Sequence, residues 1–256
     1  MYVRLSLLGG TIIFILGGLI ALLWLPFWRV TQMDVAGVST LSAGDIQATV
    51  QEKITGRYWY LFPKNNILLY PRQGIESALR AHYPTLAEAS VGAENLHTLG
   101  ITVVERQPAA LWCGQDFSAE NNCSFMDASG LVYAPAAQFE GDAYQKYFGA
   151  LASPESLGQY LTPEQFHSLS ALAQALAAKV PGDPVAGLWV ESDGDAHLIF
   201  NSGFTLLFNS TDDTGAVFNR FSLALTAAPF TAHPASSFEY LDLRFGNKLY
   251  YKLKSS

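Results

Sequence analysis

The feature that most constrains this chain is a run of 24 residues without a charged side chain, from Leu5 to Trp28, between Arg4 and Arg29. A helix of that length, rising about 1.5 Å per residue, is long enough to cross about 30 Å of hydrocarbon. A cleavable signal peptide has a shorter apolar segment that ends in small residues, whereas this run ends in aromatic ones. We therefore expect an uncleaved transmembrane signal-anchor helix over residues 5–28, after a short cytoplasmic tail at residues 1–4.

This helix would make the protein a single-pass protein of the cell membrane. The sequence has no second apolar run of comparable length, so the remaining residues are expected to lie on one side of the bilayer. Long domains that follow a signal-anchor are exported largely regardless of modest charge. We expect a cytoplasmic N-terminus and extracytoplasmic residues 29–256.

The charge distribution excludes some classes of protein and singles out one segment. The chain is 50% hydrophobic and only 14% charged, with a net charge of −7, which excludes a disordered chain and argues against nucleic-acid binding. Residues 108–243 hold three basic and fifteen acidic residues, whereas residues 244–256 hold four basic and no acidic ones. An acidic body therefore ends in a basic segment.

Residues 29–107 predict a small domain with the element order β-α-α-β-β. Residues 30–38 alternate like a half-buried strand, and Ser42 is a typical cap for a following helix. A second helix is expected from Pro71 to Pro84, and two strands at residues 86–91 and 99–105. Both helices have one apolar face, so we expect this domain to have its own core.

Several short segments of this domain and of the chain's end match one known family. They are Val35-Ala36-Gly37-Val38, His82-Tyr83-Pro84-Thr85-Leu86-Ala87-Glu88-Ala89-Ser90-Val91, Ile101-Thr102-Val103-Val104-Glu105-Arg106-Gln107-Pro108-Ala109-Ala110-Leu111-Trp112, Phe125-Met126-Asp127-Ala128-Ser129-Gly130-Leu131-Val132-Tyr133 and Tyr240-Leu241-Asp242-Leu243-Arg244-Phe245. The first three, in this order, resemble a POTRA domain, and the whole set resembles the FtsQ/DivIB cell-division proteins. The resemblance implies a bitopic scaffold of the divisome that docks other membrane proteins during septum formation.

Residues 108–256 predict a second domain, with an antiparallel β-sheet and helices on one face. Helices are expected from Thr162 to about Lys179 and around residues 214–227, with short strands between them. A final hairpin is expected over residues 238–253, turning at Gly246-Asn247. The predicted fold class is α+β: a transmembrane helix, a POTRA domain at 29–107 and a β-rich domain at 108–256.

The two cysteines of the chain, Cys113 and Cys123, are ten residues apart and flank a predicted hairpin. On the exported side of a membrane such a pair can form a disulfide, and a loop this short gives a chain-entropy estimate of about 2.5–3 kcal/mol. Two reduced thiols are the alternative. We expect the disulfide.

The sequence offers no constellation that points to catalysis. The five histidines are scattered, and no nucleophile elbow or phosphate-binding loop is present. Glu191, Asp193 and Asp195 are interpreted as solvated acids of a turn rather than as calcium ligands. Glu105 and Arg106 are interpreted as a structural ion pair. We expect no enzyme, no cofactor, no metal and no small-molecule substrate.

Other functional classes share parts of this pattern. POTRA domains also occur in proteins of envelope assembly and secretion, a pilin-like surface protein also begins with an apolar helix, and an extracytoplasmic hydrolase is a further alternative. The assembly machines need a C-terminal β-barrel of many strands, and the pilin processing signal needs an early acidic residue; the first acid here is Asp34.

The family resemblance also implies where a partner binds. In FtsQ/DivIB proteins FtsB adds a strand to the corresponding final strands, so we expect an FtsB/FtsL-like single-span coiled-coil partner at this edge. The candidate partner-binding residues are Arg244, Phe245, Gly246, Lys248 and Tyr250. The basic segment would steer an acidic partner toward the acidic body. The alternative is that Lys248, Lys252 and Lys254 only protect the edge from aggregation.

Overall fold

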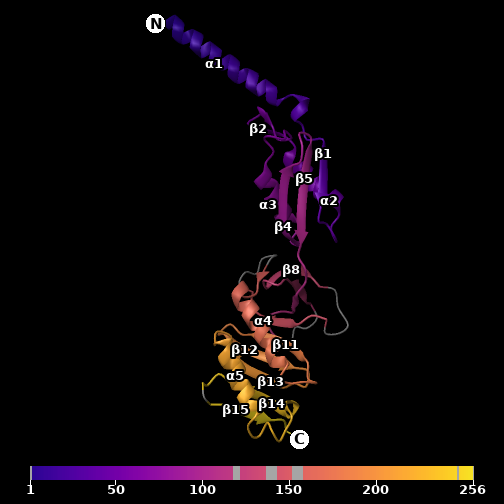
Figure 1. Ribbon diagram of the computed structural model, residues 1–256, viewed down its shortest axis with the longest axis vertical. Coiled ribbons are helices and arrows are strands. Elements are labelled where there is room, and N and C mark those ends of the chain that lie inside the picture. The colour runs from indigo at the N-terminus through magenta and orange to yellow at the C-terminus, as the bar shows by residue number, and fades with distance from the viewer. Residues whose placement is uncertain (1, 118–121, 137–142, 152–157, 247, 256) are drawn as a thin grey trace. The chain divides into compact units, whose positions relative to one another are not determined.

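The structure is a computed structural model (Figure 1), and it describes residues 2–117, 122–136, 143–151, 158–246 and 248–255. Contacts between residues divide the chain into two compact units, residues 1–106 and residues 107–256. We call them unit 1 and unit 2 and describe each by itself. The turn residue Asn247, named above for the final hairpin, lies outside the described residues.

Unit 1 begins with helix α1 (Tyr2–Leu23) and a short 3-10 helix η1 (Pro26–Trp28). Within the described residues no helix combines the length and the apolar character that crossing a membrane requires. The predicted transmembrane helix over residues 5–28, and with it the single-pass membrane localisation, the cytoplasmic tail at residues 1–4 and the extracytoplasmic placement of residues 29–256, are therefore wrong.

The aromatic end of the apolar run explains part of this error. Helix α1 ends at Leu23, and the residues after it contact later segments of unit 1 instead of continuing the helix. The indole Nε1 of Trp24 donates a hydrogen bond of 2.8 Å to the carbonyl of Leu61. The Phe27 ring packs edge-on against Trp28 and His97, at centroid distances of 5.1 and 5.8 Å. These rings contact protein residues of unit 1.

The remainder of unit 1 is a three-stranded sheet with two helices. Strand β1 runs parallel to β5, and β5 pairs antiparallel with β4, giving the order β1-β5-β4. Between the two helices the chain adds a small hairpin, β2-β3, to the predicted β-α-α-β-β order. The elements are β1 (Gln32–Ala36), α2 (Ala43–Ile54), β2 (Arg57–Tyr58), β3 (Phe62–Pro63), α3 (Arg72–His82), β4 (Leu86–Ala93) and β5 (Thr98–Glu105).

The core of unit 1 lies between the helices and the sheet. Ile46, Val50 and Ile54 recur every four residues on α2, so they share one face and are all buried. Ile75 and Leu79 do the same on α3. These side chains form one apolar cluster with the inward residues of β4 and β5, namely Leu86, Ala89, Val91, Leu99, Ile101 and Val103.

Glu105 at the end of β5 closes this core with hydrogen bonds. Its carboxylate is buried and accepts hydrogen bonds from the backbone N–H groups of Ser39 at 2.7 Å and Leu41 at 3.2 Å, and from the Ser39 hydroxyl at 2.8 Å. Burial alone would raise the pKa of Glu105, but hydrogen bonds from Thr40, Ser39 and Leu41 outweigh it and lower the pKa to about 2. Glu105 therefore holds the segment that leads into α2.

The turn between β2 and β3 has an unusual backbone. Trp59 and Tyr60 both have a positive φ, of 47° and 63°, and the N–H of Leu61 donates to the carbonyl of Tyr58 at 2.9 Å. Two successive left-handed residues define a type I′ turn, which favours asparagine and glycine because other side chains are strained there. Both aromatic side chains are nevertheless exposed, by 82% for Trp59 and 90% for Tyr60.

Unit 2 is built on one sheet of ten strands with the order β10-β8-β7-β6-β9-β11-β12-β13-β14-β15. Helices α4 and α5 cover one face of it (Figure 1). The helices are α4 (Pro163–Ala177), α5 (Thr214–Leu225) and the 3-10 helix η2 (Ala235–Ser237). The strands are β6 (Ala110–Trp112), β7 (Ser124–Met126), β8 (Leu131–Pro135), β9 (Lys146–Gly149), β10 (Gly158–Gln159), β11 (Val185–Val190), β12 (Asp195–Phe200), β13 (Thr205–Asn209), β14 (Phe238–Asp242) and β15 (Tyr250–Leu253).

The α+β class is observed, but the prediction that this sheet is antiparallel is wrong, because the sheet is mixed. The pairs β6–β9, β9–β11 and β13–β14 are parallel. Parallel neighbours need a long crossover, which is usually a helix. Helix α4 lies in the connection from β9 to β11, and α5 in the connection from β13 to β14. The two helices therefore serve as crossovers as well as covering the sheet.

The two cysteines lie beside the first hairpin of unit 2. Strand β6 pairs antiparallel with β7, and Trp112 faces Ser124 at the end of this pairing. Cys113 and Cys123, one residue further on each side, are joined by a disulfide with a Cα–Cα distance of 4.1 Å. Cys113 is fully buried in a small apolar cluster with Leu111 and Phe148. The bridge closes the loop beyond this strand pair.

Candidate functional site: the β15 edge

Strand β15 forms one edge of the ten-stranded sheet. Among the described strands it pairs only with β14, antiparallel, with Asp242 facing Tyr250 and Leu241 facing Tyr251. All four residues of β15 are exposed, and three of them are large and apolar or aromatic: Tyr250, Tyr251 and Leu253. A strand edge of this kind presents backbone N–H and C=O groups with which another strand can pair.

The side chains of β15 alternate between the two faces of the sheet. Tyr251 lies on the face that α5 covers, with its ring 5.9 Å from that of Phe238 and 6.1 Å from that of Phe230. Tyr250 lies on the opposite face, beside a pocket with a volume of about 410 Å³. Tyr250 therefore belongs both to the edge strand and to the face of the sheet that α5 does not cover, which we call the open face.

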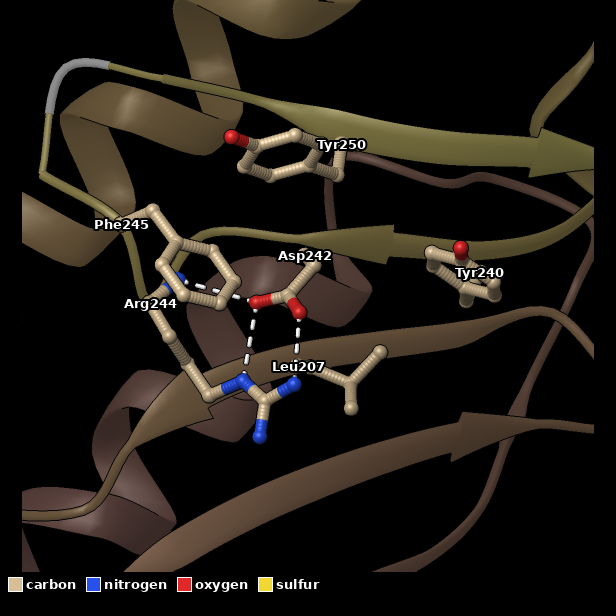
Figure 2. A pocket seen from close by; sticks show the side chains of 6 residues that line it. All are labelled: Leu207, Tyr240, Asp242, Arg244, Phe245 and Tyr250. Atoms are coloured by element: carbon tan, nitrogen blue, oxygen red, sulfur yellow. Dashed lines mark hydrogen bonds and ion pairs between the residues drawn. The ribbon is translucent and has the colours of Figure 1, made fainter.

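Six residues from three strands and one loop line this pocket, which Figure 2 shows from close by. The rings of Phe245 and Tyr250 meet nearly at right angles, with centroids 5.1 Å apart. Phe245 is 54% exposed and Tyr250 is 48% exposed, so both rings are accessible to a partner. The lining residues are Leu207, Tyr240, Asp242, Arg244, Phe245 and Tyr250.

A charged network forms one wall of the pocket. Arg244 donates from Nε and Nη2 to the two carboxylate oxygens of Asp242, at 2.9 and 2.6 Å, and its backbone N–H donates to the same group at 3.0 Å (Figure 2). The third guanidinium nitrogen, Nη1, pairs with Asp195, the first residue of β12. Asp242 itself is buried.

The electrostatics of the network follow from this geometry. Burial by itself would raise the pKa of Asp242, but the hydrogen bonds and the positive charge of Arg244 outweigh burial and lower it. Hydrogen bonding to Asp242, helped by Asp195, raises the pKa of Arg244 further above its usual range. Arg244 and Asp242 therefore stay charged, and paired, throughout the physiological pH range.

The predicted partner-binding residues are only partly brought together. Arg244, Phe245 and Tyr250 line the pocket, whereas Gly246 and Lys248 do not. Gly246 adopts a φ of +64° in the loop between β14 and β15, a conformation that favours glycine. The backbone N–H of Lys248 donates to the carbonyl of Phe245 at 3.1 Å, and the residue is exposed.

Sequence reasoning missed Leu207, Tyr240 and Asp242 as lining residues. Tyr240 and Asp242 belong to the same family motif as Arg244 and Phe245, and this shared motif is the signal that could have drawn attention to them. Asp195 was interpreted as a solvated turn acid, because nothing in a single sequence reveals that β12 lies two strands from β14. Leu207 belongs to β13, which is separated from β14 by a helix.

The cations of the basic C-terminal segment are largely engaged within the protein. Lys252 pairs with Glu239 at 2.6 Å, and Lys254 donates to the carbonyls of Ser202 and Ser236 at 2.6 and 2.8 Å. Arg244 and Lys252 thus have acidic partners, whereas Lys254 bonds neutral carbonyls and keeps its charge. The cations of this segment stand beside three acids, Asp195, Asp242 and Glu239, so the net positive charge that could attract an acidic partner is small. Comparison of the chain with known protein families and with curated proteins finds no match.

Proposed function

We propose that this protein is an FtsQ/DivIB-like scaffold of bacterial cell division that recruits an FtsB/FtsL-like coiled-coil protein by strand addition to β15. The observation that carries the proposal is an exposed edge strand beside an aromatic pocket. The segment that resembles the family's final motif contains the end of β14 and supplies four of the residues that line the pocket: Tyr240, Asp242, Arg244 and Phe245.

The chemistry of the site suits docking. An added strand gains backbone hydrogen bonds along β15, and its side chains on the open face of the sheet meet Tyr250 and Phe245. Tyrosine, the residue at position 250, is enriched among the residues that dominate binding energy at protein interfaces. In the neighbouring charged network Arg244 is already paired with Asp195 and Asp242, so the network forms a wall of the pocket without requiring a charged ligand.

The test replaces both accessible rings of the site in the full chain, as Phe245→Glu with Tyr250→Glu. Charges placed there would have to be desolvated when a strand is added, so capture of the FtsB/FtsL-like partner from the same organism should fall at least tenfold. Tyr60→Glu is the control, because Tyr60 is an exposed aromatic residue of unit 1, outside the site.

Circular dichroism and thermal unfolding establish that the variants are folded. Cells that carry only the doubly substituted protein should elongate without dividing, whereas cells with the Tyr60→Glu control should divide normally. Capture of the partner at wild-type strength by the folded double variant would contradict the proposed site.

A further inference from the structure

Two cations flank β15 and tie its two ends to β12 and to the turn that follows β12. Arg244, in the loop before β15, pairs through Nη1 with Asp195, the first residue of β12. Lys254, directly after β15, donates at 2.6 Å to the carbonyl of Ser202, two residues beyond the end of β12 at Phe200. The Arg244 contact spans β13, because the strand order is β12-β13-β14-β15, whereas Ser202 lies in the turn that joins β12 to β13.

Each of these contacts is supported by a second one. Arg244 also holds Asp242, the last residue of β14, through two guanidinium hydrogen bonds. Lys254 also donates at 2.8 Å to the carbonyl of Ser236 in η2, which leads into β14. The cations therefore fix the chain where it enters and where it leaves β15, a strand whose four residues are all exposed.

The charge that remains for a partner is small. Lys252, in the middle of β15, pairs with Glu239 on β14. Within the described residues, Lys248 is the cation of this segment whose side chain makes no hydrogen bond or ion pair. The surface that β15 and the pocket offer instead is aromatic and aliphatic, from Tyr250, Phe245, Tyr240 and Leu207.

We propose that Arg244 and Lys254 act as internal clamps that hold β15 as a preformed edge, and that the segment recruited there is extended and largely apolar rather than acidic. Asp195 is then a positioning residue, which acts on the partner only through Arg244. This inference rests on the proposed function for the partner, but the clamps themselves are a property of the protein alone. A preformed edge lowers the ordering cost of binding.

The first arm of the test needs no partner. Hydrogen exchange of the amides in residues 250–253 is compared between the wild-type full chain, Asp195→Asn and Lys254→Met. Each variant should exchange about tenfold faster at β15, with exchange in β11 unchanged. Lys254→Arg, which can still donate to both carbonyls, should restore slow exchange, and Lys248→Met is the matched control. Exchange at the wild-type rate in Asp195→Asn and Lys254→Met would overturn the clamps.

The second arm measures affinity for the FtsB/FtsL-like coiled-coil protein of the same organism at about 50 and 500 mM NaCl. An apolar, backbone-mediated interface should change its Kd less than about threefold, because such contacts are hardly screened by salt. Asp195→Asn should weaken binding about tenfold at both concentrations, and Lys53→Met, at a cation of unit 1, should not. Weakening of the wild-type complex by more than tenfold in salt would overturn the apolar partner.

The two arms separate the two proposals. If the folded wild-type protein captures no such partner, the proposed function fails, and the apolar partner fails with it. The exchange measurements then still decide whether Arg244 and Lys254 clamp β15.

Discussion

Glu105 and Asp242 are both buried carboxylates at the end of a strand, and each is satisfied in a different way. Glu105 accepts hydrogen bonds from the backbone N–H groups of residues 39–41, which precede helix α2. Its carboxylate thus takes the place of water as the acceptor for these groups. Asp242 is paired with a guanidinium. A buried acid is stable only when such partners are present, because desolvation of the charged form is costly.

The pKa of Glu105 predicts an acid-dependent stability of unit 1. The folded-state pKa of about 2 lies below the ordinary value of 4.5, so the contribution is complete above about pH 4.5 and is lost as the pH falls toward 2. With allowance for solvent screening, it amounts to about 2 kcal/mol. Glu105→Gln should therefore destabilise unit 1 by about this amount at pH 7.

Urea unfolding of the full chain at several pH values checks this prediction. The difference between wild type and Glu105→Gln should shrink steadily below pH 4.5. Glu88→Gln, on the same sheet but less buried, serves as the control. An equal difference at pH 7 and pH 2.5 would show that Glu105 acts by packing and not by charge.

At the scale of elements, the β2-β3 hairpin combines two unfavourable features. Its turn holds Trp59 and Tyr60 in the left-handed region, and both rings are exposed to solvent. Residues other than glycine, asparagine and aspartate pay about 1 kcal/mol or more for this conformation. The turn is therefore strained locally and contributes little burial in return.

Replacing this turn with the favoured residues, as Trp59→Asn with Tyr60→Gly, should raise the stability of unit 1 by about 1–2 kcal/mol. The reason is relief of backbone strain without loss of buried apolar surface. Differential scanning calorimetry of the full chain should show a higher melting temperature for unit 1 and an unchanged melting temperature for unit 2. The reversed pair, Trp59→Gly with Tyr60→Asn, is a control for the removal of the rings, and a lower melting temperature in the first variant would refute the interpretation.

Elements with a clear local signal could be predicted from the sequence, and contacts between distant elements could not. The four-residue spacing of Ile46, Val50 and Ile54 indicates a helix face wherever the helix lies. The parallel pairing of β13 with β14, and thus the position of Leu207, depends on how α5 crosses over the sheet. The sequence around Trp24 is compatible with contact of its ring with lipid or with protein, because an apolar pattern does not distinguish these two environments.

At the scale of the whole molecule, the chain consists of two units with separate apolar clusters. The disulfide Cys113–Cys123 belongs to unit 2. Closure of its loop gives a chain-entropy contribution of about 2.5–3 kcal/mol. Reduction should therefore destabilise unit 2 and leave unit 1 unchanged.

Thermal unfolding with and without a reducing agent measures this effect. The transition of unit 2 should move to lower temperature by several degrees, and that of unit 1 should stay in place. A chain consisting of residues 29–107 should show a cooperative unfolding transition by circular dichroism, and the reducing agent should not change its melting temperature. A shift of both transitions together would mean that the two units do not unfold independently.

Apart from β10, which pairs with β8 at the other edge, the strands from β9 onward lie across the sheet of unit 2 in their order along the chain, β9-β11-β12-β13-β14-β15. Each new strand can therefore dock on the one synthesised before it, and the sheet grows outward during translation. The edge proposed to recruit a partner comes into existence only after residue 253 has been made. A chain terminated early would expose β14 or β13 as its edge and would lack the aromatic pocket. Such an incomplete chain could not bind the partner and so could not keep it from the complete protein.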